Sequence, residues 1–315
     1  MSGGVPLVSI LIPAYNAQAF LADCIESALA QTYPATEIVV VDDGSTDGTL
    51  AIARRYESGK VKVISQPNGG QPAAYNAASS AAQGDYFQYL DADDLLHSEK
   101  ISRQLARLAG SSGNTVATGA WARFVRHPNS ANFIVEPIWG DFDPVTWLSM
   151  SWAGGGMMHV GSWLVPRQVA AKAGPWPEDL RWATCIDGDF FTRVVLASDG
   201  CVFVRDALAY YRTVPNSHSS RRDRRSLSAS LEVLLSMGRA LLATENSERT
   251  RLAFATNLQE FVYTVYPDQP DLVASAEDYI QQLGGTRFRF AGGPTTTLLA
   301  RLIGWKTAKR LRRLF

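Results

Sequence analysis

Asp91 and Asp93 are separated by one residue and directly follow an apolar run at residues 86–90. If the extended backbone of that run continues, both side chains leave on the same face, because side chains alternate along a strand. Two carboxylates on one face repel each other unless a positive charge lies between them. A hard divalent cation such as Mg²⁺ or Mn²⁺ binds oxygen ligands and keeps positions open for phosphate oxygens. The pair therefore predicts a metal site, and a helix cap formed by residues 91–94 is the alternative interpretation.

A second acidic pair, Asp42 and Asp43, ends another apolar run at residues 38–41. One of these carboxylates is expected to accept hydrogen bonds from the base or ribose of a nucleotide. A helix N-cap is the alternative, because residues 43–47 read Asp-Gly-Ser-Thr-Asp before an apolar-periodic helix. Farther along, Gly69 and Gly70 allow a ligand close to the backbone, since glycine has no Cβ.

Asp187 is the candidate general base, and it precedes a helical pattern at residues 190–196. A group that deprotonates a substrate hydroxyl must be a carboxylate or a histidine within hydrogen-bond reach of it. The alternative is that Asp187 caps this helix while Asp189 pairs with Arg193 at i,i+4.

The elements that position these residues alternate between strands and helices. Apolar runs predict strands at residues 8–12, 38–41, 61–64 and 86–90, and three- and four-residue apolar spacing predicts helices at about 20–29, 46–56 and 72–82. Ser45 or Thr46 is expected to cap the second helix. Alternating strands and helices predict a parallel α/β sheet, in which ligands bind at the carboxyl ends of the strands. The three polar loops all follow strands, so one site is expected to collect them.

The remainder of the chain changes in composition. Residues 114–211 contain β-rich pieces, and seven of the eight tryptophans lie between Trp121 and Trp182. Helical patterns at residues 227–243, 249–266 and 272–283 predict a helical extension. Lys and Arg number 15 against 21 Asp and Glu in residues 1–220, and 15 against 9 in residues 221–315. Acidic chemistry is therefore expected in residues 1–220 and a basic surface in residues 221–315.

Bulk properties exclude several classes of protein. The net charge is zero, so the basic excess expected for nucleic-acid binding is missing. The three cysteines, Cys24, Cys185 and Cys201, lack the spacing of a zinc site or a disulfide framework and are expected to be free thiols. The N-terminus has no basic segment typical of a secretory signal, and no run approaches the ~20 apolar residues that cross a bilayer. A cytoplasmic protein is expected.

Three stretches together resemble the family 2 glycosyltransferases, inverting enzymes of the GT-A fold that include bacterial polysaccharide and glycolipid glycosyltransferases. They are VSILIPAYNAQAFLADCIESALAQTYPATEIVVVDDGSTDGT, QPNGGQPAAYNAASSAAQGDYFQYLDADD and IDGDFFTRV. Their order and spacing are much more specific than a lone Asp-x-Asp. The resemblance implies a GT-A catalytic domain at residues 1–220, with a nucleotide-sugar half at 1–110 and an acceptor half at 111–220. Residues 221–315 follow as the helical extension.

The resemblance also implies a role for each matched position. The residues that border the nucleotide are Pro13, Ala14, Tyr15, Asp42 and Asp43, with Asp43 contacting the base. Asp91 is implied to lie near the ribose and the metal, and Asp93 to be the direct metal ligand. Asp187 is implied to be the base of a single-displacement transfer.

Two positions depart from the family pattern. Ile186 stands where members often carry Glu, and Val214 where many carry His. His218 is at best a displaced substitute for that histidine. Arg212 is expected to contact phosphate or to form a structural salt bridge. His159 follows three glycines and is expected either to contact the acceptor from a mobile loop or to be structural.

Residues 295–315 combine leucines and a tryptophan with six Lys and Arg residues. A helix with these on opposite sides can lie on the anionic inner face of a cell membrane, within reach of lipid-linked acceptors. Docking of this helix on the acidic catalytic domain is the alternative.

The expected function is therefore the inverting transfer of a hexosyl group from a nucleotide-diphosphate sugar to a saccharide or lipid-linked glycan, with a UDP-sugar as the expected donor. Two rival functions are a nucleotidyltransferase and a catalytically silent nucleotide-sugar-binding module. A nucleotidyltransferase would carry a Gly-rich basic loop near the N-terminus, which Pro13-Ala14-Tyr15-Asn16 is not.

Overall fold

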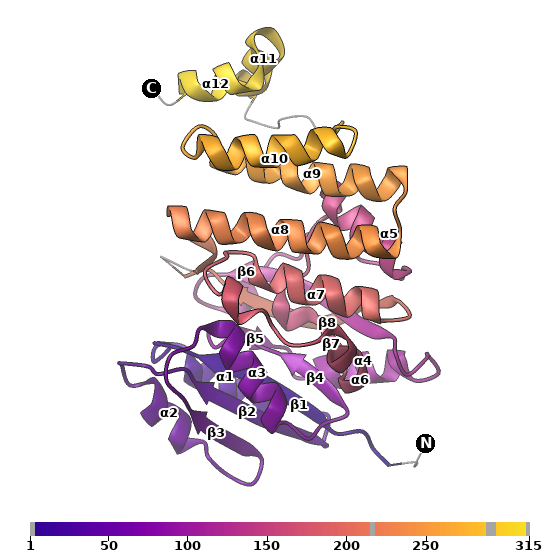
Figure 1. Ribbon diagram of the computed structural model, residues 1–315. Coiled ribbons are helices and arrows are strands. Elements are labelled where there is room, and N and C mark those ends of the chain that lie inside the picture. Colours follow the sequence, from indigo (N-terminus) through magenta and orange to yellow (C-terminus); the bar gives the residue numbers. More distant parts are fainter. Residues whose placement is uncertain (1–3, 215–217, 288–293, 313–315) are drawn as a thin grey trace.

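The computed structural model describes residues 4–214, 218–287 and 294–312 (Figure 1). Its first half alternates strands and helices as expected. The strands are β1 (Val8–Ala14), β2 (Thr36–Asp42), β3 (Val61–Ser65) and β4 (Tyr86–Tyr89). The helices between them are α1 (Leu21–Leu29), α2 (Thr49–Arg55) and α3 (Gln71–Ala81). Every residue of β1 is buried, which is typical of a strand covered by helices on both faces of a parallel sheet.

Within the described residues the strands form one eight-stranded sheet, in the order β3-β2-β1-β4-β7-β6-β8-β5. The first four are mutually parallel, whereas β7 (Leu164–Pro166) pairs antiparallel with β4. The other strands are β5 (Leu95–Leu96), β6 (Val116–Phe124) and β8 (Cys201–Arg212). The sheet is thus parallel in the N-terminal half and mixed beyond β4.

The start of α2 corrects one prediction. Neither Ser45 nor Thr46 caps this helix, which begins at Thr49, where Asp47 Oδ1 accepts the Thr49 N–H at 2.9 Å. The Ser45 hydroxyl and the Thr46 N–H bind Asn16 instead. The helix-cap alternative for residues 91–94 is also wrong, because this loop leads into β5.

Helices dominate the rest of the chain. They are α4 (Lys100–Leu108), α5 (Pro144–Met150), α6 (Arg167–Ala173), α7 (Ile186–Ala197), α8 (Arg224–Thr244), α9 (Glu248–Val265), α10 (Pro270–Gln282), α11 (Pro294–Ile303) and α12 (Trp305–Arg312). Short helical turns lie at Pro128–Ser130, Ser151–Gly155, Val160–Ser162, Glu178–Leu180 and His218–Ser220. Figure 1 shows α7, α8 and the α9–α10 pair stacked in successive layers away from the sheet.

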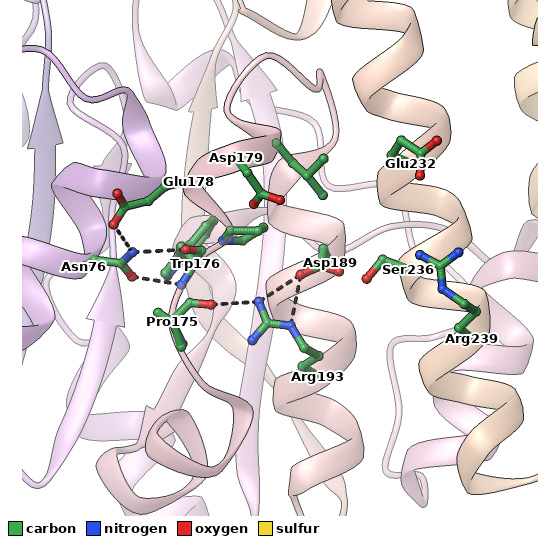
Figure 2. Close-up of a pocket in the computed structure, with 12 residues that line it drawn as sticks. Asn76, Pro175, Trp176, Glu178, Asp179, Asp189, Arg193, Glu232, Ser236 and Arg239 are labelled. Carbon is green, nitrogen blue, oxygen red and sulfur yellow. Dashed lines mark hydrogen bonds and ion pairs between the residues drawn. The ribbon is translucent and has the colours of Figure 1, made fainter.

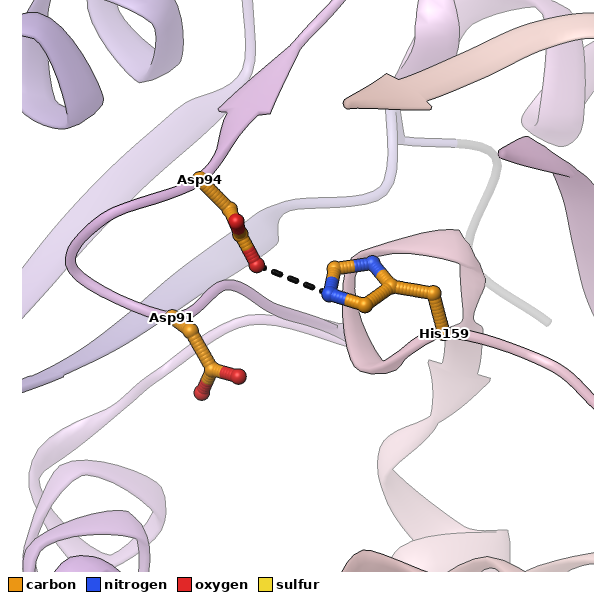
Figure 3. A group of neighbouring side chains, drawn as sticks. All are labelled: Asp91, Asp94 and His159. Carbon is orange, nitrogen blue, oxygen red and sulfur yellow. Dashed lines mark ion pairs between the residues drawn. The ribbon is translucent and has the colours of Figure 1, made fainter. Parts of the chain in front are cut away.

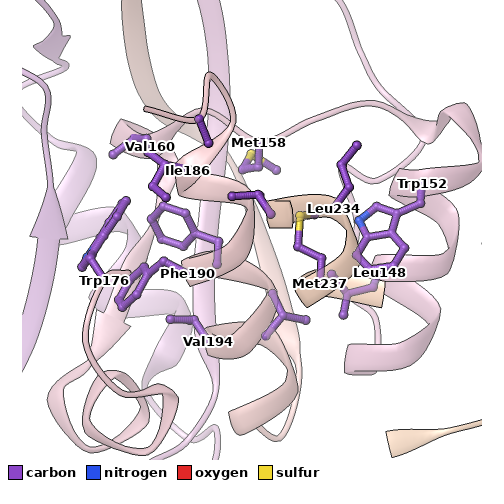
Figure 4. Packing of buried hydrophobic residues seen from close by; sticks show 14 of the residues in the cluster. Leu148, Trp152, Met158, Val160, Trp176, Ile186, Phe190, Val194, Leu234 and Met237 are labelled. Carbon is purple, nitrogen blue, oxygen red and sulfur yellow. The ribbon is translucent and has the colours of Figure 1, made fainter. Parts of the chain in front are cut away.

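The contact between α7 and α8 joins the sheet half to the extension. Ile186, Phe190 and Val194 of α7 belong to the same buried cluster as Leu234 and Met237 of α8 (Figure 4). The two helices approach closely where α7 has a glycine: a Cβ on Gly188 would lie 3.2 Å from the Met237 sulfur. One core therefore continues from the sheet into the extension.

Helix α8 is long and apolar enough to cross a membrane by length and composition, with a mean hydropathy of 1.3 in its most apolar window. Half of that window is buried inside the fold. Core helices of this kind pass the same test. The three cysteines are free, as expected.

The C-terminal segment is two helices rather than the single amphipathic helix expected. The chain turns at Gly304, whose φ is +78°. Trp305 of α12 then packs edge-on against Tyr263 and Tyr266 of α9, and Lys306 pairs with Glu277 of α10 at 2.6 Å. Helix α12 therefore docks on the protein, but on α9 and α10 rather than on the sheet half. Helix α11, in contrast, leaves Leu298 and Leu302 exposed.

Gly238→Ala should destabilise the fold, because a Cβ at this position of α8 would overlap the Phe254 ring of α9. In an open helix the same change would stabilise by roughly 0.5–1 kcal/mol, but overpacking costs about 1–3 kcal/mol. Urea unfolding followed by tryptophan fluorescence measures the difference. Gly59→Ala, where a Cβ meets nothing within 4 Å, is the matched control and should change stability by less than about 0.5 kcal/mol. Equal stabilities of the two variants would contradict this packing.

Candidate functional site

The ends of β1, β2 and β3 bring two of the predicted loops together. Ala14 is the register partner of Asp42, which in turn is the partner of Ser65. The Asp43 N–H continues the pairing by donating to Ala14 O at 2.8 Å. The segments that follow these strands therefore leave the sheet at one edge, as predicted.

Asp43 organises the Gly69-Gly70 turn. Its Oδ1 accepts from the Gln66 amide and the Gly69 N–H at 2.8 and 2.9 Å, and its Oδ2 accepts from the Gly70 N–H at 2.8 Å. Gly70 has φ +91°, a conformation that favours glycine. Asp43 is nearly fully buried, and Oδ2 keeps one lone pair for a ligand.

The segment after β1 forms the rim beside this turn. Pro13 and Ala14 are the last residues of the strand, and Tyr15 is 52% exposed. Asn16, at φ +48°, bridges to Ser45 and Thr46. Asp42 is buried beneath the rim, and its Oδ1 has no hydrogen-bond partner among the described residues.

Asp91 is held by two donors from α3. Its Oδ1 accepts from Gln71 Nε2 at 2.7 Å and from the Tyr75 hydroxyl at 2.8 Å. Tyr75 is completely buried and stacks on Trp176 at 4.5 Å. Helix α3 therefore fixes one oxygen of Asp91 and leaves the other available.

Asp91, Asp94 and His159 each place a ligand atom within 4.8 Å of the others (Figure 3). His159 Nε2 lies 2.7 Å from Asp94 Oδ2, and both groups are buried. This contact is not aligned as a hydrogen bond, so neither atom has a hydrogen-bond partner within the described parts of the chain. Two incompletely satisfied buried atoms beside Asp91 indicate a site that takes up a further polar or charged group.

The tautomer of His159 follows from its other nitrogen. Nδ1 accepts the Gly161 N–H at 3.1 Å, so the neutral ring carries its proton on Nε2. A protonated nitrogen cannot bind a metal ion. The His159 ring lies beside Asp94, is stacked on Tyr211 at 4.6 Å and is only 4% exposed.

Asp93 and Arg212 lie on the outer side of this cluster. The Asp93 carboxylate is half-buried and accepts no hydrogen bond from another described residue, while its carbonyl accepts from Arg212 Nε at 2.7 Å. The Arg212 N–H binds Asp94 Oδ1 at 2.7 Å, and its guanidinium pairs with Asp23 at 3.2 Å. The structural salt bridge expected as one alternative for Arg212 is therefore present.

Burial and mutual repulsion dominate the electrostatics. Desolvation, together with the charges of Asp94 and Asp93, raises the pKa of Asp91 well above its ordinary value. Desolvation and the Asp94 charge raise the pKa of Asp93 to about 6, and desolvation also raises that of Asp94. The pKa of His159 is lowered by burial. A cation bound here would relieve this cost.

Asp187 lies in the first turn of α7, which begins at Ile186. Burial raises the pKa of its carboxyl. No side chain caps this helix, but Asp189 and Arg193 do form the i,i+4 ion pair, at 2.8 Å. The Asp187 charge acts to raise the pKa of His159, so its carboxylate lies within electrostatic range of that ring. The side chain of His218 lies outside the described residues.

Sequence reasoning missed a buried polar network behind the site. The Lys100 ammonium is fully buried and donates to Gln88 Oε1 at 2.5 Å and Gln104 Oε1 at 2.6 Å. The two amides in turn donate to Gly161 O and Ser162 O, on the loop that carries His159. The available signal was a glutamine inside an apolar strand. Tyr75 as a partner of Asp91, and Asp94 as a neighbour of His159, were missed because sequence spacing does not reveal which segments of the chain meet.

Comparison with known proteins identifies relatives in sequence and in fold. The family described as "Glycosyl transferase family 2" matches residues 9–133, which contain the Asp42–Asp43 pair and the 91–94 loop. A hyaluronan synthase from Pasteurella multocida is 44% identical over 99 residues, 31% of this chain and 10% of that protein. An uncharacterized glycosyltransferase from Rickettsia typhi is 32% identical over 177 residues, 56% of this chain and 55% of that protein. The chain thus spans between a tenth and about half of the length of these relatives.

The fold extends the likeness over nearly the whole chain. The 1–349 fragment of TarS from S. aureus, solved in complex with UDP-GlcNAc, superposes with a TM-score of 0.72 at 18% identity and covers 98% of this chain and 92% of the fragment. The chain therefore has the GT-A fold, as predicted, with the C-terminal helices included in the match.

The free energy of unfolding of Lys100→Met should fall relative to that of the wild type as the pH rises. Burial lowers the pKa of Lys100 well below its ordinary value, so the unfolded chain binds the extra proton between the lowered value and about 10.5. A lowered lysine pKa makes unfolding less favourable as pH increases, by at most about 1.4 kcal/mol per pH unit. Urea unfolding of both proteins from pH 7 to 10.5 measures this. A pH-independent difference would show that Lys100 is not desolvated.

Proposed function

Since this chain carries a family 2 glycosyltransferase domain at residues 9–133, we propose that it transfers a sugar, with inversion, from a nucleotide-diphosphate sugar to a hydroxyl of a saccharide or lipid-linked glycan. The supporting observation is the cluster of the half-buried Asp91 and Asp93 and the fully buried Asp94 at the carboxyl ends of the parallel strands. Desolvation raises the pKa of Asp91 and that of Asp93, so a bound cation would stabilise the charged form of the cluster. A UDP-sugar is the proposed donor.

The residues present fit a divalent cation. Three carboxylates supply hard oxygen ligands suited to Mg²⁺ or Mn²⁺. We assign Asp93 as the direct ligand, since its carboxylate is unpartnered, with the free oxygen of Asp91 beside it. His159 is not assigned as a ligand, because its Nδ1 accepts the Gly161 N–H and its Nε2 carries the proton. When bound, the cation would neutralise the departing diphosphate.

The nucleotide would lie between the two N-terminal loops. Tyr15 borders the base with Pro13 and Ala14, and Asp43 Oδ2 is the acceptor available to it. Asp42 supports this loop from beneath, where its Oδ1 is unpartnered. Arg181, which donates to Gly69 O at 3.2 Å, would border the diphosphate.

Asp187 would act on the acceptor. Its carboxylate takes the proton of the attacking hydroxyl as the new bond to the anomeric carbon forms and the bond to the diphosphate oxygen breaks on the opposite face. Burial raises the pKa of Asp187, which makes it a stronger base near neutral pH. Arg212 is engaged by Asp23 and Asp93 and would support the cluster rather than bind phosphate.

Two further proposals concern location and domains. We propose that residues 1–220 form the catalytic domain and residues 221–315 an extension whose α11 contacts the cytoplasmic face of the membrane. Support for the contact comes from the exposed Leu298 and Leu302.

The function is tested with a panel of UDP- and GDP-sugars and Mn²⁺, scoring nucleotide release with and without saccharide acceptors. Asp187→Asn should lower transfer at least about 100-fold while UDP·Mn²⁺ binding is retained, because only the base is lost. Asp93→Ala should lose both. The control is Asp206→Asn, an exposed acid on β8, which should retain full activity.

Other results assign the rivals. Diphosphate release from a nucleoside triphosphate and a sugar phosphate would identify a nucleotidyltransferase. Donor binding without any turnover would identify a silent binding module.

Tyr75→Phe should weaken Mn²⁺ binding in the presence of UDP. The variant removes the hydroxyl that holds Asp91, a hydrogen bond to a charged group worth about 1.5–3 kcal/mol. A loss of 10- to 100-fold in affinity by titration calorimetry is expected. Tyr89→Phe is the matched control: the Tyr89 hydroxyl is equally buried but has no partner among the described residues, so its removal should leave affinity unchanged. Identical affinities in all three proteins would refute the Asp91 assignment.

A further inference from the structure

A side groove of about 820 Å³ lies beside the acidic cluster and shares none of its carboxylates. We define it by Asn76, Trp176, Asp189, Arg193, Glu232 and Arg239 (Figure 2). Its walls come from α3, the segment at residues 175–180, α7 and α8. Volumes of roughly 300–1,000 Å³ are typical of ligand sites.

The wall nearest the sheet is rigid before any ligand arrives. Asn76 clamps the 175–178 segment, donating to Trp176 O at 3.0 Å and Glu178 Oε1 at 2.8 Å and accepting the Trp176 N–H at 2.8 Å. On α7, Arg193 donates to Asp189 Oδ2 and to the carbonyls of Ala173 and Pro175. Such preorganisation lowers the entropy cost of binding.

The groove also offers groups without partners. Asp189 is only 3% exposed, yet its Oδ1 accepts no hydrogen bond within the described parts of the chain. On the opposite wall, Glu232 and Arg239 make no hydrogen bond or ion pair with a described residue. They lie seven residues apart on α8, about 10 Å along the axis, too far to pair with each other.

These groups fit a neutral polyhydroxylated ligand. A sugar hydroxyl both donates and accepts, so it can serve a carboxylate and a guanidinium at once. The groove carries four acids, Glu178, Asp179, Asp189 and Glu232, against two arginines. This excess of negative charge disfavours uronates and phosphates.

The groove lies close to the reaction site. Trp176 stacks on Tyr75, which holds Asp91. Asp189 and the candidate base Asp187 lie in the same turn of α7, on different faces of the helix. We infer that the side groove binds the uncharged saccharide portion of the acceptor, beyond the sugar that receives the transfer. The link to an acceptor rests on the proposed function, whereas saccharide binding itself does not.

The test therefore measures saccharide binding with neither donor nor metal present. Cellotetraose is titrated into the full chain and followed by saturation-transfer NMR and calorimetry, with tetragalacturonate as the anionic probe. Cellotetraose should bind at least fivefold more tightly than tetragalacturonate. We expect two groove variants to weaken cellotetraose binding at least fivefold each. Arg239→Ala removes a cation from the groove, and Ser236→Tyr fills it.

Arg251→Ala on α9 is the matched control and should bind like the wild type, since Arg251 is exposed and lies outside the groove. UDP·Mn²⁺ thermal shifts should be equal in all variants, which separates loss of the groove from loss of the fold. Absence of cellotetraose binding, tighter binding of tetragalacturonate, or unchanged affinity in both groove variants would overturn the inference. A failure of the UDP-sugar panel with cellotetraose binding intact would overturn the proposed function alone.

Discussion

Repulsion between buried carboxylates is the constraint around which this site is built. Asp91, Asp93 and Asp94 lie within four residues at the end of β4, and burial makes the charged form of each expensive. Hydrogen-bond donors offset part of this cost: α3 supplies Tyr75 and Gln71, and the end of β8 supplies the backbone N–H of Arg212. The Arg212 guanidinium also lies beside Asp93. The remaining charge is left for a ligand to neutralise. A site of this kind is poised to bind a cation because its empty form is electrostatically unfavourable.

The sheet topology explains how so many donors reach one point. The parallel strands β1 to β4 direct their loops to one edge of the sheet. Strand β7, antiparallel to β4, and strand β8, parallel to β6, bring segments of the second half of the chain to the same region. Gln88 and Lys100 then secure the loop of His159 from behind, which sets the ring that faces Asp94. The acidic cluster and its supports are therefore contributed by segments more than 100 residues apart in the sequence.

Local patterns predicted what local physics controls. The N-terminal strands and helices, the free cysteines and the placement of the acidic loops all followed from apolar periodicity and from turns at strand ends. The cap of α2 did not, because Asn16, a residue from another loop, engages Ser45 and Thr46. Nor did the break at Gly304, where tertiary packing of Trp305 decides the geometry. The partners of Asp91 and His159 depend on contacts between distant segments, and one sequence contains no direct record of these.

The close approach of Gly188 and Met237 has a consequence for how such a catalyst can diversify. The helix that carries Asp187 is wedged between the sheet and α8, so its tilt is inherited from the outer layers. Remodelling those layers would re-aim Asp187, the proposed base, while the loops of the sheet stay unchanged. If the proposed roles hold, the stacked helices would set the orientation of the base and the loops of the sheet would set the choice of donor, so the two could change separately.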